Sequence, residues 1–343
     1  MAQAQRRVRI DDVARAAGVS ITTVSHALSG KGRLPDARRE QVKAVARALG
    51  YSPNPAARSL ASGKTGLMAI VVSAPGNVSI PFTEIDYYVD LINAATARAI
   101  ERGYGVVLAP STAGAESWRR VPLDGVIVVD PARGDPAVRT LRAREVPMVF
   151  VGRDSDGAGG DLVVENDRRG ATRMVLDHLI DAGASRAGVL TLGTFESFTE
   201  DCIDEYGRWC EQRGTAPVLH AAPIHSTAGP HAFREAAEGF LDRPDRPDGV
   251  FCLYERLAVE VLRAARERGV RVPDDLLVVS INEMGLGETT QPSLTELEIN
   301  QDVLGAAAAG LLVDHLEGGV AASVRDIATR LIVRASSSRT RSA

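Results

Sequence analysis

Apolar residues are spaced in two different ways along this chain, and the change comes near Thr65. In the first part they recur every three or four positions, which is the spacing of short amphipathic helices. Gly18 is placed to turn the chain between the first two helices, and Ser20 is placed to cap the second. Three such helices are able to bury one small core. The predicted helices cover residues 11–17, 20–28 and 36–49, with Val42, Val45 and Leu49 on the apolar face of the third and Gly50 at its end.

After Thr65, continuous apolar runs alternate with stretches of helical spacing. Continuous rather than alternating apolar strands indicate parallel sheets that are covered by helices on both faces. About 270 residues of this pattern are too many for one sheet, so we expect two similar α/β lobes with a ligand site at the rim that the strand ends face. The predicted strands are 67–72, 105–109, 125–129, 147–152, 187–192, 249–253 and 276–281, and the predicted helices are 86–102, 169–181, 201–213, 232–241 and 256–268.

Residues 53–64 lie between the two patterns. Asn54 as an N-cap and Pro55 at the first helical position indicate a helix start, because this position does not need the N–H that proline lacks. The helix would have about six residues, whereas about 12 are needed for a helix to be stable alone in water. We therefore expect this hinge segment to fold only when something holds it.

The net charge of −4 is divided unevenly along the chain. Residues 1–64 hold 12 Lys and Arg against 4 Asp and Glu, a charge of +8, and the remainder holds 28 against 40, a charge of −12. A basic module is thus attached to an acidic body. A basic module of this size is typical of a part that contacts phosphate, although a solvated helical surface would carry the same charge.

Several classes of protein do not fit the composition. The polar and basic start MAQAQRRVRI differs from a secretion signal, so we expect the chain in the cytoplasm. The longest apolar run, residues 303–313, is too short to cross a membrane. Three cysteines without C-x-x-C spacing favour buried thiols over disulfides or zinc. His220, His225 and His231 indicate a surface loop rather than a metal site, and we expect no metal and no cofactor.

Enzyme motifs are weak or missing in the sequence. The stretch GAGGD at residues 157–161 lacks the third glycine and the helix start of a dinucleotide fingerprint. The chain contains no phosphate-binding P-loop, no zinc-protease motif and no nucleophile elbow. We therefore do not expect an enzyme.

The residues around the first turn form a spaced motif, A-x3-G-V-S-x2-T-V-S, from Ala14 to Ser25. A small side chain at Ala14 lets the second helix cross close to the first, so that the second helix presents its N-terminal turn outward. A short helical hairpin that packs on the body is the alternative. In a helix-turn-helix of this kind Ile21, Thr22 and His26 would point at base edges, and Ser20, Thr23 and Ser25 would reach phosphates or bases.

The chain resembles the LacI/GalR family of transcription regulators over essentially its whole length. The stretches that carry the resemblance are IDDVARAAGVSITTVSHALSG, ALGYSPNPAARSLASGKTG, DGVIVVDP, RGVRVPDD and PSLTELEIN. The resemblance implies an all-α helix-turn-helix head-piece plus an α/β periplasmic-binding-protein-like core of two doubly wound parallel-sheet lobes. It also implies a homodimer that binds a near-palindromic operator, with hinge helices at the minor groove, Leu60 wedged between base pairs and Asn54 and Arg58 near the DNA backbone.

The resemblance and the periodicity together predict the domains and the DNA contacts. The predicted domains are a helix-turn-helix at 1–52, a hinge at 53–64, an N-terminal effector and dimerisation lobe at 65–164 plus 296–321, a C-terminal effector lobe at 165–295 plus 322–335, and a disordered tail at 336–343. The predicted DNA-binding residues are Arg9, Ser20, Ile21, Thr22, Thr23, Ser25, His26, Ser29, Arg33, Tyr51, Asn54, Arg58 and Leu60.

His26 departs from the family pattern, which usually has arginine at this position. Arginine contacts guanine with two hydrogen bonds, whereas a neutral histidine offers one donor and one acceptor. His26 then makes a single shorter contact to a base, or it is inert on an exposed helix. If it contacts a base, the operator differs at that position.

The predicted effector cleft is atypical for the family. Asp204 stands where the family commonly has a ligand-binding arginine, Tyr254-Glu255 replaces Asn-Asp, and Asn282-Glu283 replaces Asp-Asp. The remaining side chains suit a ligand with an apolar face and hydroxyls or a cation. Each of them taken singly fits a helix cap or a core aromatic equally well. The predicted effector-binding residues are Phe82, Asp86, Arg153, Phe198, Asp201, Tyr254, Glu255 and Asn282, with Phe195 beside them.

The sequence therefore predicts a homodimeric DNA-binding transcription repressor that a small-molecule effector gates through closure of the two lobes. A solute-binding protein of the same two-lobed architecture is the first alternative, and the basic head-piece argues against it. A sugar-modifying α/β enzyme is the second, and it would need convergent catalytic groups that the sequence does not display.

Overall fold

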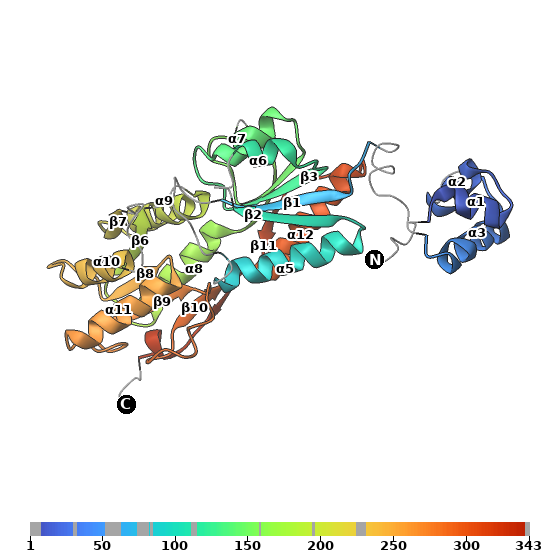
Figure 1. Ribbon diagram of the computed structural model, residues 1–343. Coiled ribbons are helices and arrows are strands. Elements are labelled where there is room, and N and C mark those ends of the chain that lie inside the picture. The colour runs from blue at the N-terminus through green and yellow to red at the C-terminus, as the bar shows by residue number, and fades with distance from the viewer. Residues whose placement is uncertain are drawn as a thin grey trace, which may run out of the picture. The chain divides into compact units, whose positions relative to one another are not determined.

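The computed structural model describes residues 8–29, 33–51, 63–73, 82, 85–110, 115–157, 159–193, 196–223 and 231–339. The chain divides into two compact units, Met1–Thr65 and Gly66–Ala343. Figure 1 shows the helices and strands of each unit. Within the ranges above, no helix is long and apolar enough to cross a membrane.

The first unit consists of α1 (Ile10–Ala17), α2 (Ile21–Ser29) and α3 (Asp36–Ala48), drawn in dark blue in Figure 1. Each helix contributes one fully buried valine to a shared core, namely Val13, Val24 and Val42. Gly18 has a φ of +64° and turns the chain after α1. The Ser20 hydroxyl oxygen accepts the backbone N–H of Thr23 at 3.1 Å, which is the N-cap bond of α2. The predicted turn and cap are confirmed.

One predicted core position of α3 is wrong. Leu49 follows the last helical residue and is 38% exposed, whereas Ala46 is 3% exposed and packs in the core. Ala46 lies four residues after Val42, so both side chains lie on the same face of the helix. The helix ends before Leu49 could return to that face.

The second unit holds two six-stranded sheets with the same order of strands, β11-β5-β4-β3-β1-β2 and β12-β10-β9-β8-β6-β7. Neighbouring strands are parallel except β12, which runs antiparallel to β10. This is the predicted arrangement of two doubly wound lobes. The first sheet is built from Leu67–Val72, Gly105–Pro110, Gly125–Val129, Met148–Val151, Leu162–Asn166 and Val324–Ile327, and the second from Ala187–Gly193, Leu219–Pro223, Gly249–Cys252, Leu277–Ile281, Thr295–Glu298 and Arg330–Ile332.

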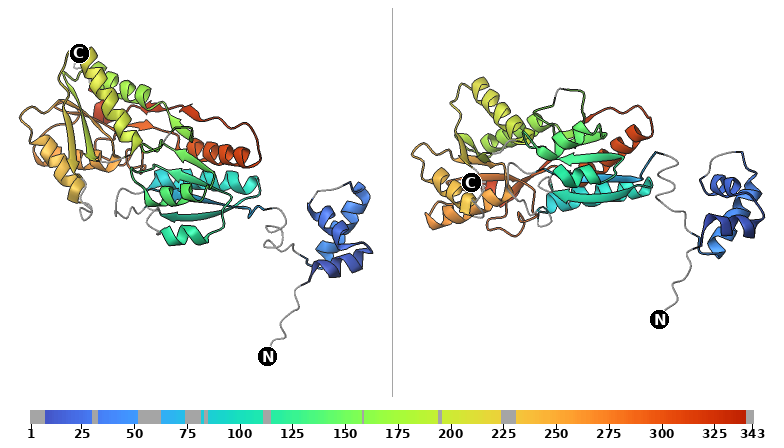
Figure 2. Two further views of the ribbon diagram at one scale, coloured as in Figure 1. Left: turned by 90° about the horizontal axis from the view of Figure 1, so that it is seen from above. Right: turned by 45° about the horizontal axis from the view of Figure 1, so that its top comes forward.

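Helices cover both faces of each sheet (Figures 1 and 2). In the first lobe, α5 and α12 pack on one face, and α6 and α7 pack on the other. In the second lobe, α8 and α9 pack on one face, and α10 and α11 pack on the other. The helices are α5 (Asp86–Glu101), α6 (Ala115–Arg120), α7 (Pro136–Ala143), α8 (Arg168–Asp181), α9 (Ser197–Gln212), α10 (His231–Leu241), α11 (Glu255–Glu267) and α12 (Gln301–Leu316).

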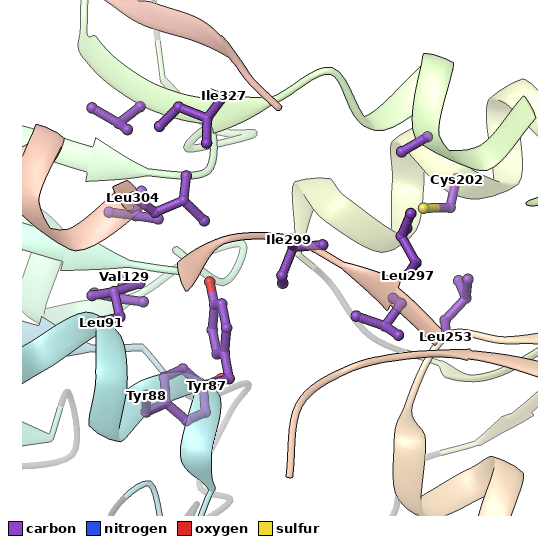
Figure 3. Close-up of a cluster of buried hydrophobic side chains, with 14 of the residues drawn as sticks. Tyr87, Tyr88, Leu91, Val129, Cys202, Leu253, Leu297, Ile299, Leu304 and Ile327 are labelled. Atoms are coloured by element: carbon purple, nitrogen blue, oxygen red, sulfur yellow. The ribbon is translucent and has the colours of Figure 1, made fainter. Parts of the chain in front are cut away.

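The largest apolar cluster includes residues of both lobes. Figure 3 shows Val129 and Leu304 from the first lobe on one side and Leu253 and Leu297 from the second lobe on the other. Ile299, in the link between β10 and α12, lies between these two groups (Figure 3). Apolar packing therefore continues along a segment that joins the lobes.

The chain passes between the lobes three times, after β5, after β10 and after β11. The Asn166 amide donates to the carbonyl oxygens of Ile299 at 2.9 Å and Ile327 at 3.0 Å. The Asn300 amide donates to the carbonyl oxygen of Ala328 at 2.7 Å. Two asparagines thus bind the three crossover segments to one another.

Two predicted lobe boundaries differ from the sheets. The second lobe was expected to resume at residue 322, but β11 pairs with β5 in the first sheet. The first lobe was expected to resume at residue 296, but β10 pairs with β9 in the second sheet. Both strands are short and carry charged residues, so neither has the continuous apolar pattern that identified the other parallel strands.

The predicted disordered tail is wrong for residues 336–339. A 3₁₀ turn spans Ala335–Ser337, and its last two serines are buried. The Ser336 hydroxyl donates to the Val278 carbonyl oxygen at 2.6 Å, and the Ser337 hydroxyl lies 2.6 Å from the hydroxyl of Thr295. These hydrogen bonds hold the segment against the second sheet. Residues 340–343 lie outside the described residues.

Candidate functional site

The solvent-facing side of α2 is polar except at its first residue. Ile21, Thr22, Ser25 and His26 are exposed, and Ile21 keeps 49% of its surface in contact with solvent. These positions follow the i, i+1, i+4, i+5 spacing of one helix face, while Val24 points into the core. The core thus holds α2 so that its N-terminal half presents short side chains outward.

The other predicted DNA-binding positions differ in exposure. Arg9 and Arg33 are exposed, and Tyr51 is half-buried against the core of the first unit. Thr23 is half-buried, and its hydroxyl lies 2.8 Å from that of Ser20. Ser29 is the last residue of α2. Asn54, Arg58 and Leu60 lie outside the described residues.

In the second unit, polar side chains from both lobes gather where the strands end. We name Tyr87, Asp130, Arg168, Glu196 and Glu283 the junction cluster. Asp130 comes directly after β3, and Glu283 lies two residues after the end of β9, so each follows a parallel strand. The Tyr87 hydroxyl donates to Asp130 Oδ1 at 3.3 Å, and the Tyr87 backbone N–H donates to the Glu283 carbonyl oxygen at 2.8 Å. The ends of the two sheets therefore meet, as expected for a doubly wound fold.

Burial governs the electrostatics of the junction cluster. Burial raises the pKa of Glu283 to about 8, and the negative charge of Glu196 adds to this shift. Burial likewise raises the pKa of Asp130 to about 7, again with a contribution from Glu196, while the positive charge of Arg168 opposes it. Two carboxyl groups of the cluster thus hold a proton more readily than in water, and the Arg168 guanidinium reduces this effect at Asp130.

Arg153 and Asp201, two predicted effector contacts, bind each other. The Arg153 guanidinium donates to both carboxylate oxygens of Asp201, at 2.8 and 3.0 Å. Arg153 belongs to the first lobe and Asp201 to α9 of the second, so the pair joins the lobes. Asp201 is almost fully buried. Its carboxylate therefore has a partner within the chain.

Glu255, another predicted effector contact, supports a loop. Its side chain is fully buried, and its carboxylate oxygens accept the backbone N–H groups of Glu283 at 3.0 Å, Met284 at 2.5 Å and Leu286 at 2.5 Å. The carboxylate is occupied by the loop that carries Glu283. Its role in this structure is to shape the wall of the junction.

The remaining predicted effector residues surround the same region. The Tyr254 hydroxyl donates to Glu196 Oε1 at 2.8 Å, and the Arg168 guanidinium lies 5.5 Å from the centre of the Phe198 ring. Phe82 packs against the large apolar cluster. Asp86 is exposed at the start of α5, and Asn282 is half-buried after β9. Phe195 lies outside the described residues.

An open hollow of about 370 Å³ is lined by none of the five junction-cluster residues. It is lined by Arg133, Arg153 and the segment around Asp161 from the first lobe and by Glu200 from the second. The side chains that line it are mainly charged. In the described part of the chain, no set of His, Cys, Asp and Glu side chains is arranged to hold a metal ion.

Comparisons with known proteins agree with both units. The family model "Bacterial regulatory proteins, lacI family" matches residues 9–54, and the model "Periplasmic binding protein-like domain" matches residues 176–337. The transcriptional regulator CelR of Thermobifida fusca is 31% identical over 97% of this chain and 99% of its own length. The chain belongs to the LacI family. It is a DNA-binding transcription regulator with an effector-binding domain, and LacI-family regulators are not enzymes.

Other LacI-family proteins match over most of the chain. The HTH-type transcriptional repressor PurR of Escherichia coli is 27% identical over 90% of this chain and 90% of its own length. The structure of the CelR–cellobiose complex is 26% identical and superposes with a TM-score of 0.68 over 96% of this chain and all of that one. The Lac repressor dimer bound to operator and an anti-inducer, at 21% identity, shares the fold with a TM-score of 0.76 over 97% of this chain and all of that one.

The structure of this LacI-family chain brings together residues that the sequence did not single out. Tyr87, Asp130, Arg168 and Glu196 are absent from the predicted effector set, although they meet in the junction cluster. A signal was present for one of them, because Asp130 follows a predicted apolar strand directly. Arg168 is the first residue of α8 and Glu196 directly precedes α9, and only the fold brings these two residues to the junction.

Proposed function

We propose that this LacI-family regulator binds a near-palindromic operator as a homodimer in the cytoplasm and represses transcription until an effector changes its affinity for the operator. The observation that carries the proposal is the exposed face of α2, held by a buried core in a module with a charge of +8 over residues 1–64. A short helix with an outward polar face on a basic unit suits insertion into the major groove.

The proposed contacts divide into base-reading and positioning groups. Ile21, Thr22 and His26 face outward together and would contact base edges, with the apolar side chain of Ile21 suited to a thymine methyl group. Ser20 and Thr23 are close to the N-terminus of α2, where hydroxyls and free N–H groups suit a phosphate. The family resemblance adds Leu60 as the residue that wedges between base pairs.

A mobility-shift assay tests the DNA-binding part of this proposal. The full chain is incubated with the DNA that precedes its own coding sequence, with unrelated DNA as competitor. We expect a specific shift that Thr22→Ala weakens and that Gln41→Ala, an exposed position on α3, leaves unchanged. No specific shift at low ionic strength, where phosphate contacts are strongest, would contradict the proposal for this DNA.

We further propose that the effector binds at the junction cluster. Carboxyl oxygens accept hydrogen bonds whether or not the group is ionised, so the cluster suits a molecule rich in donors, either hydroxyls or a protonated amine. The edge of Tyr254 and the ring of Phe198 offer apolar surface beside these acceptors. The solved complex of CelR with cellobiose supports a polyhydroxylated ligand for a relative of this chain.

A thermal-shift screen tests the effector part separately. The full chain is melted with cellobiose, with other saccharides and with amino sugars, since a ligand that binds only the folded state raises its melting temperature. We expect at least one of these molecules to raise it in the wild type and Asp130→Asn to abolish the rise. If none of them raises it, the proposed ligand class is wrong, while the DNA-binding proposal is untouched.

A further inference from the structure

We propose that the first turns of α9 form an ionic latch that holds the two lobes together. We use the name latch for Ser197, Glu200 and Asp201 of α9 with their first-lobe partners Arg133, Arg153 and Ser155. The proposal goes beyond the effector site, because these residues contact one another rather than a ligand. Only its final link, to effector affinity, rests on the proposed function.

The inner part of the latch is the pair of Arg153 and Asp201. A guanidinium that donates to both oxygens of one carboxylate fixes orientation as well as distance. The Asp201 side chain is 5% exposed and that of Arg153 is 37% exposed, so the pair is partly shielded from water and salt. The backbone N–H of Arg153 also donates to the Ser197 hydroxyl oxygen at 2.9 Å. One segment of the first lobe is thus bound by two residues of α9.

The second lobe holds Asp201 in place for this contact. The guanidinium groups of Arg168 and Arg169, at the start of α8, lie 3.6 and 3.7 Å from its carboxylate. Arg168 also donates to the Ser197 hydroxyl at 2.7 Å. Gly152 gives room for this arrangement, since a Cβ there would lie 2.9 Å from the Arg168 guanidinium. Contacts within the second lobe therefore position Ser197 and Asp201 toward the first lobe.

The outer part of the latch is centred on Glu200. One of its oxygens accepts from the Arg133 guanidinium at 2.6 Å, and the other accepts from the Ser155 hydroxyl at 2.8 Å. Arg133 follows β3 and Ser155 follows β4, so two separate loops of the first lobe converge on one side chain. A bridge between Ala132 and Glu196 adds a backbone contact beside them. Opening the lobes along this side must break all of these contacts together.

The latch gives the closed arrangement its own stabilisation. In this structure the latch contacts join the two lobes, and we call this arrangement closed; an arrangement with the lobes apart would lack these contacts. An effector that binds the closed lobes binds with an apparent affinity reduced by the fraction of chains that are open. The strength of the latch thus sets how much effector is needed to shift the equilibrium.

Distance measurements between the lobes test the latch without any ligand. Spin labels are attached to cysteines introduced at Arg120 on α6 and Arg266 on α11, both exposed, while the native Cys202, Cys210 and Cys252 are buried. Labelled full-length protein is diluted with unlabelled protein so that distances within one chain are read. Arg153→Gln and Glu200→Gln are compared with the wild type. Asp275→Asn, which removes an ion pair with Arg271 inside the second lobe, is the control.

We expect both latch variants to raise the population with a longer distance about fivefold, because losing one charge-assisted hydrogen bond changes an equilibrium by about this factor. The control is expected to match the wild type. Unchanged distances in both latch variants would overturn the proposal, and so would an equal change in the control. Glu200→Gln alters a side chain at the rim, so a melting curve like that of the wild type establishes that this variant is folded.

The link to the effector has its own readout. With a molecule that raises the melting temperature of the wild type, Glu200→Gln is expected to weaken binding by the same factor by which it lowers the population with the short distance. A changed distance with unchanged binding would leave the latch intact and contradict its coupling to the effector.

Discussion

His26 lies on the exposed face of α2, beside the polar side chains that we propose to meet the bases. We predict that His26→Arg changes the preferred base at one position of each half-site, toward guanine. Arginine donates two hydrogen bonds to guanine, whereas histidine forms one contact. Selection of bound sequences from random DNA duplexes by the wild type and the variant measures the preference. Identical selected sequences would show that His26 does not read a base.

The pKa of Glu283 is strongly raised at the junction of the lobes. Its pKa in the folded chain is raised to about 8 from an ordinary value of 4.5, chiefly by burial. Between these two values the folded chain binds more protons than the unfolded chain, so its stability falls as the pH rises through this window. The contribution of Glu283 is thus most favourable below about pH 4.5 and is lost by about pH 8.

We predict that Glu283→Gln is stabilising relative to the wild type at pH 8.5 and less so at pH 5.5. Because glutamine has no charge to bury, the difference should reach about 3 kcal/mol, at about 1.4 kcal/mol for each pH unit below the raised pKa, or roughly 6–12 °C in Tm. Thermal melting of the full chain at both pH values measures it. Glu211→Gln, at an exposed position, is the control. Parallel pH profiles for Glu283→Gln and the wild type would contradict the account.

At the scale of elements, the three crossover segments depend on Asn166. Its side-chain amide donates hydrogen bonds to the carbonyl oxygens of Ile299 and Ile327, and the side chain is 7% exposed. We predict that Asn166→Ala destabilises the second unit by about 1–3 kcal/mol, because it leaves these acceptors without their donor. Urea unfolding of the full chain measures the loss. Asn93→Ala, at an exposed position of α5, is expected to change stability by under about 0.5 kcal/mol. Equal effects of the two variants would show that the hydrogen bonds of the Asn166 side chain do not contribute to stability.

The hydrophobic pattern correctly predicted strands that are buried on both faces. The strands at 67–72 and 125–129 were predicted to the residue, because each is buried on both faces and reads as an unbroken apolar run. The strand Thr295–Glu298 was missed, because it alternates threonine and leucine with glutamate. Helix α12 was seen only as an apolar run, because it packs between α5 and the first sheet and lacks a polar face over most of its length.

The start of α9, which carries residues of the latch, was also not predicted by the hydrophobic pattern. The predicted helix began at Asp201, whereas the structure begins α9 at Ser197. The N-cap residue of α9 is Glu196, whose side chain makes no capping hydrogen bond to the helix start. Glutamate is not among the residues that indicate an N-cap in a sequence, so the true start gave no signal. The missed turn carries Ser197 and Glu200, which are two of the three α9 residues of the latch.

At the scale of the whole molecule, the family and the fold were predictable, but the partners of the site residues were not. The head-piece motif is contiguous in sequence, so its turn, its cap and its exposed face follow from local spacing. Arg153 and Asp201 lie 48 residues apart and in different lobes. Their pairing depends on the order of strands and on the three crossovers, and no local pattern encodes it.

The central claim is that two chains act together on one operator. Fluorescence anisotropy with the sequence that the wild type selects measures this directly, by comparing the full site with one in which a single half-site is scrambled. We predict two chains per full site and about 100-fold weaker binding to the scrambled site at fixed salt, because the second head-piece then loses its contacts. One chain per duplex with equal affinity for both sites would contradict the account.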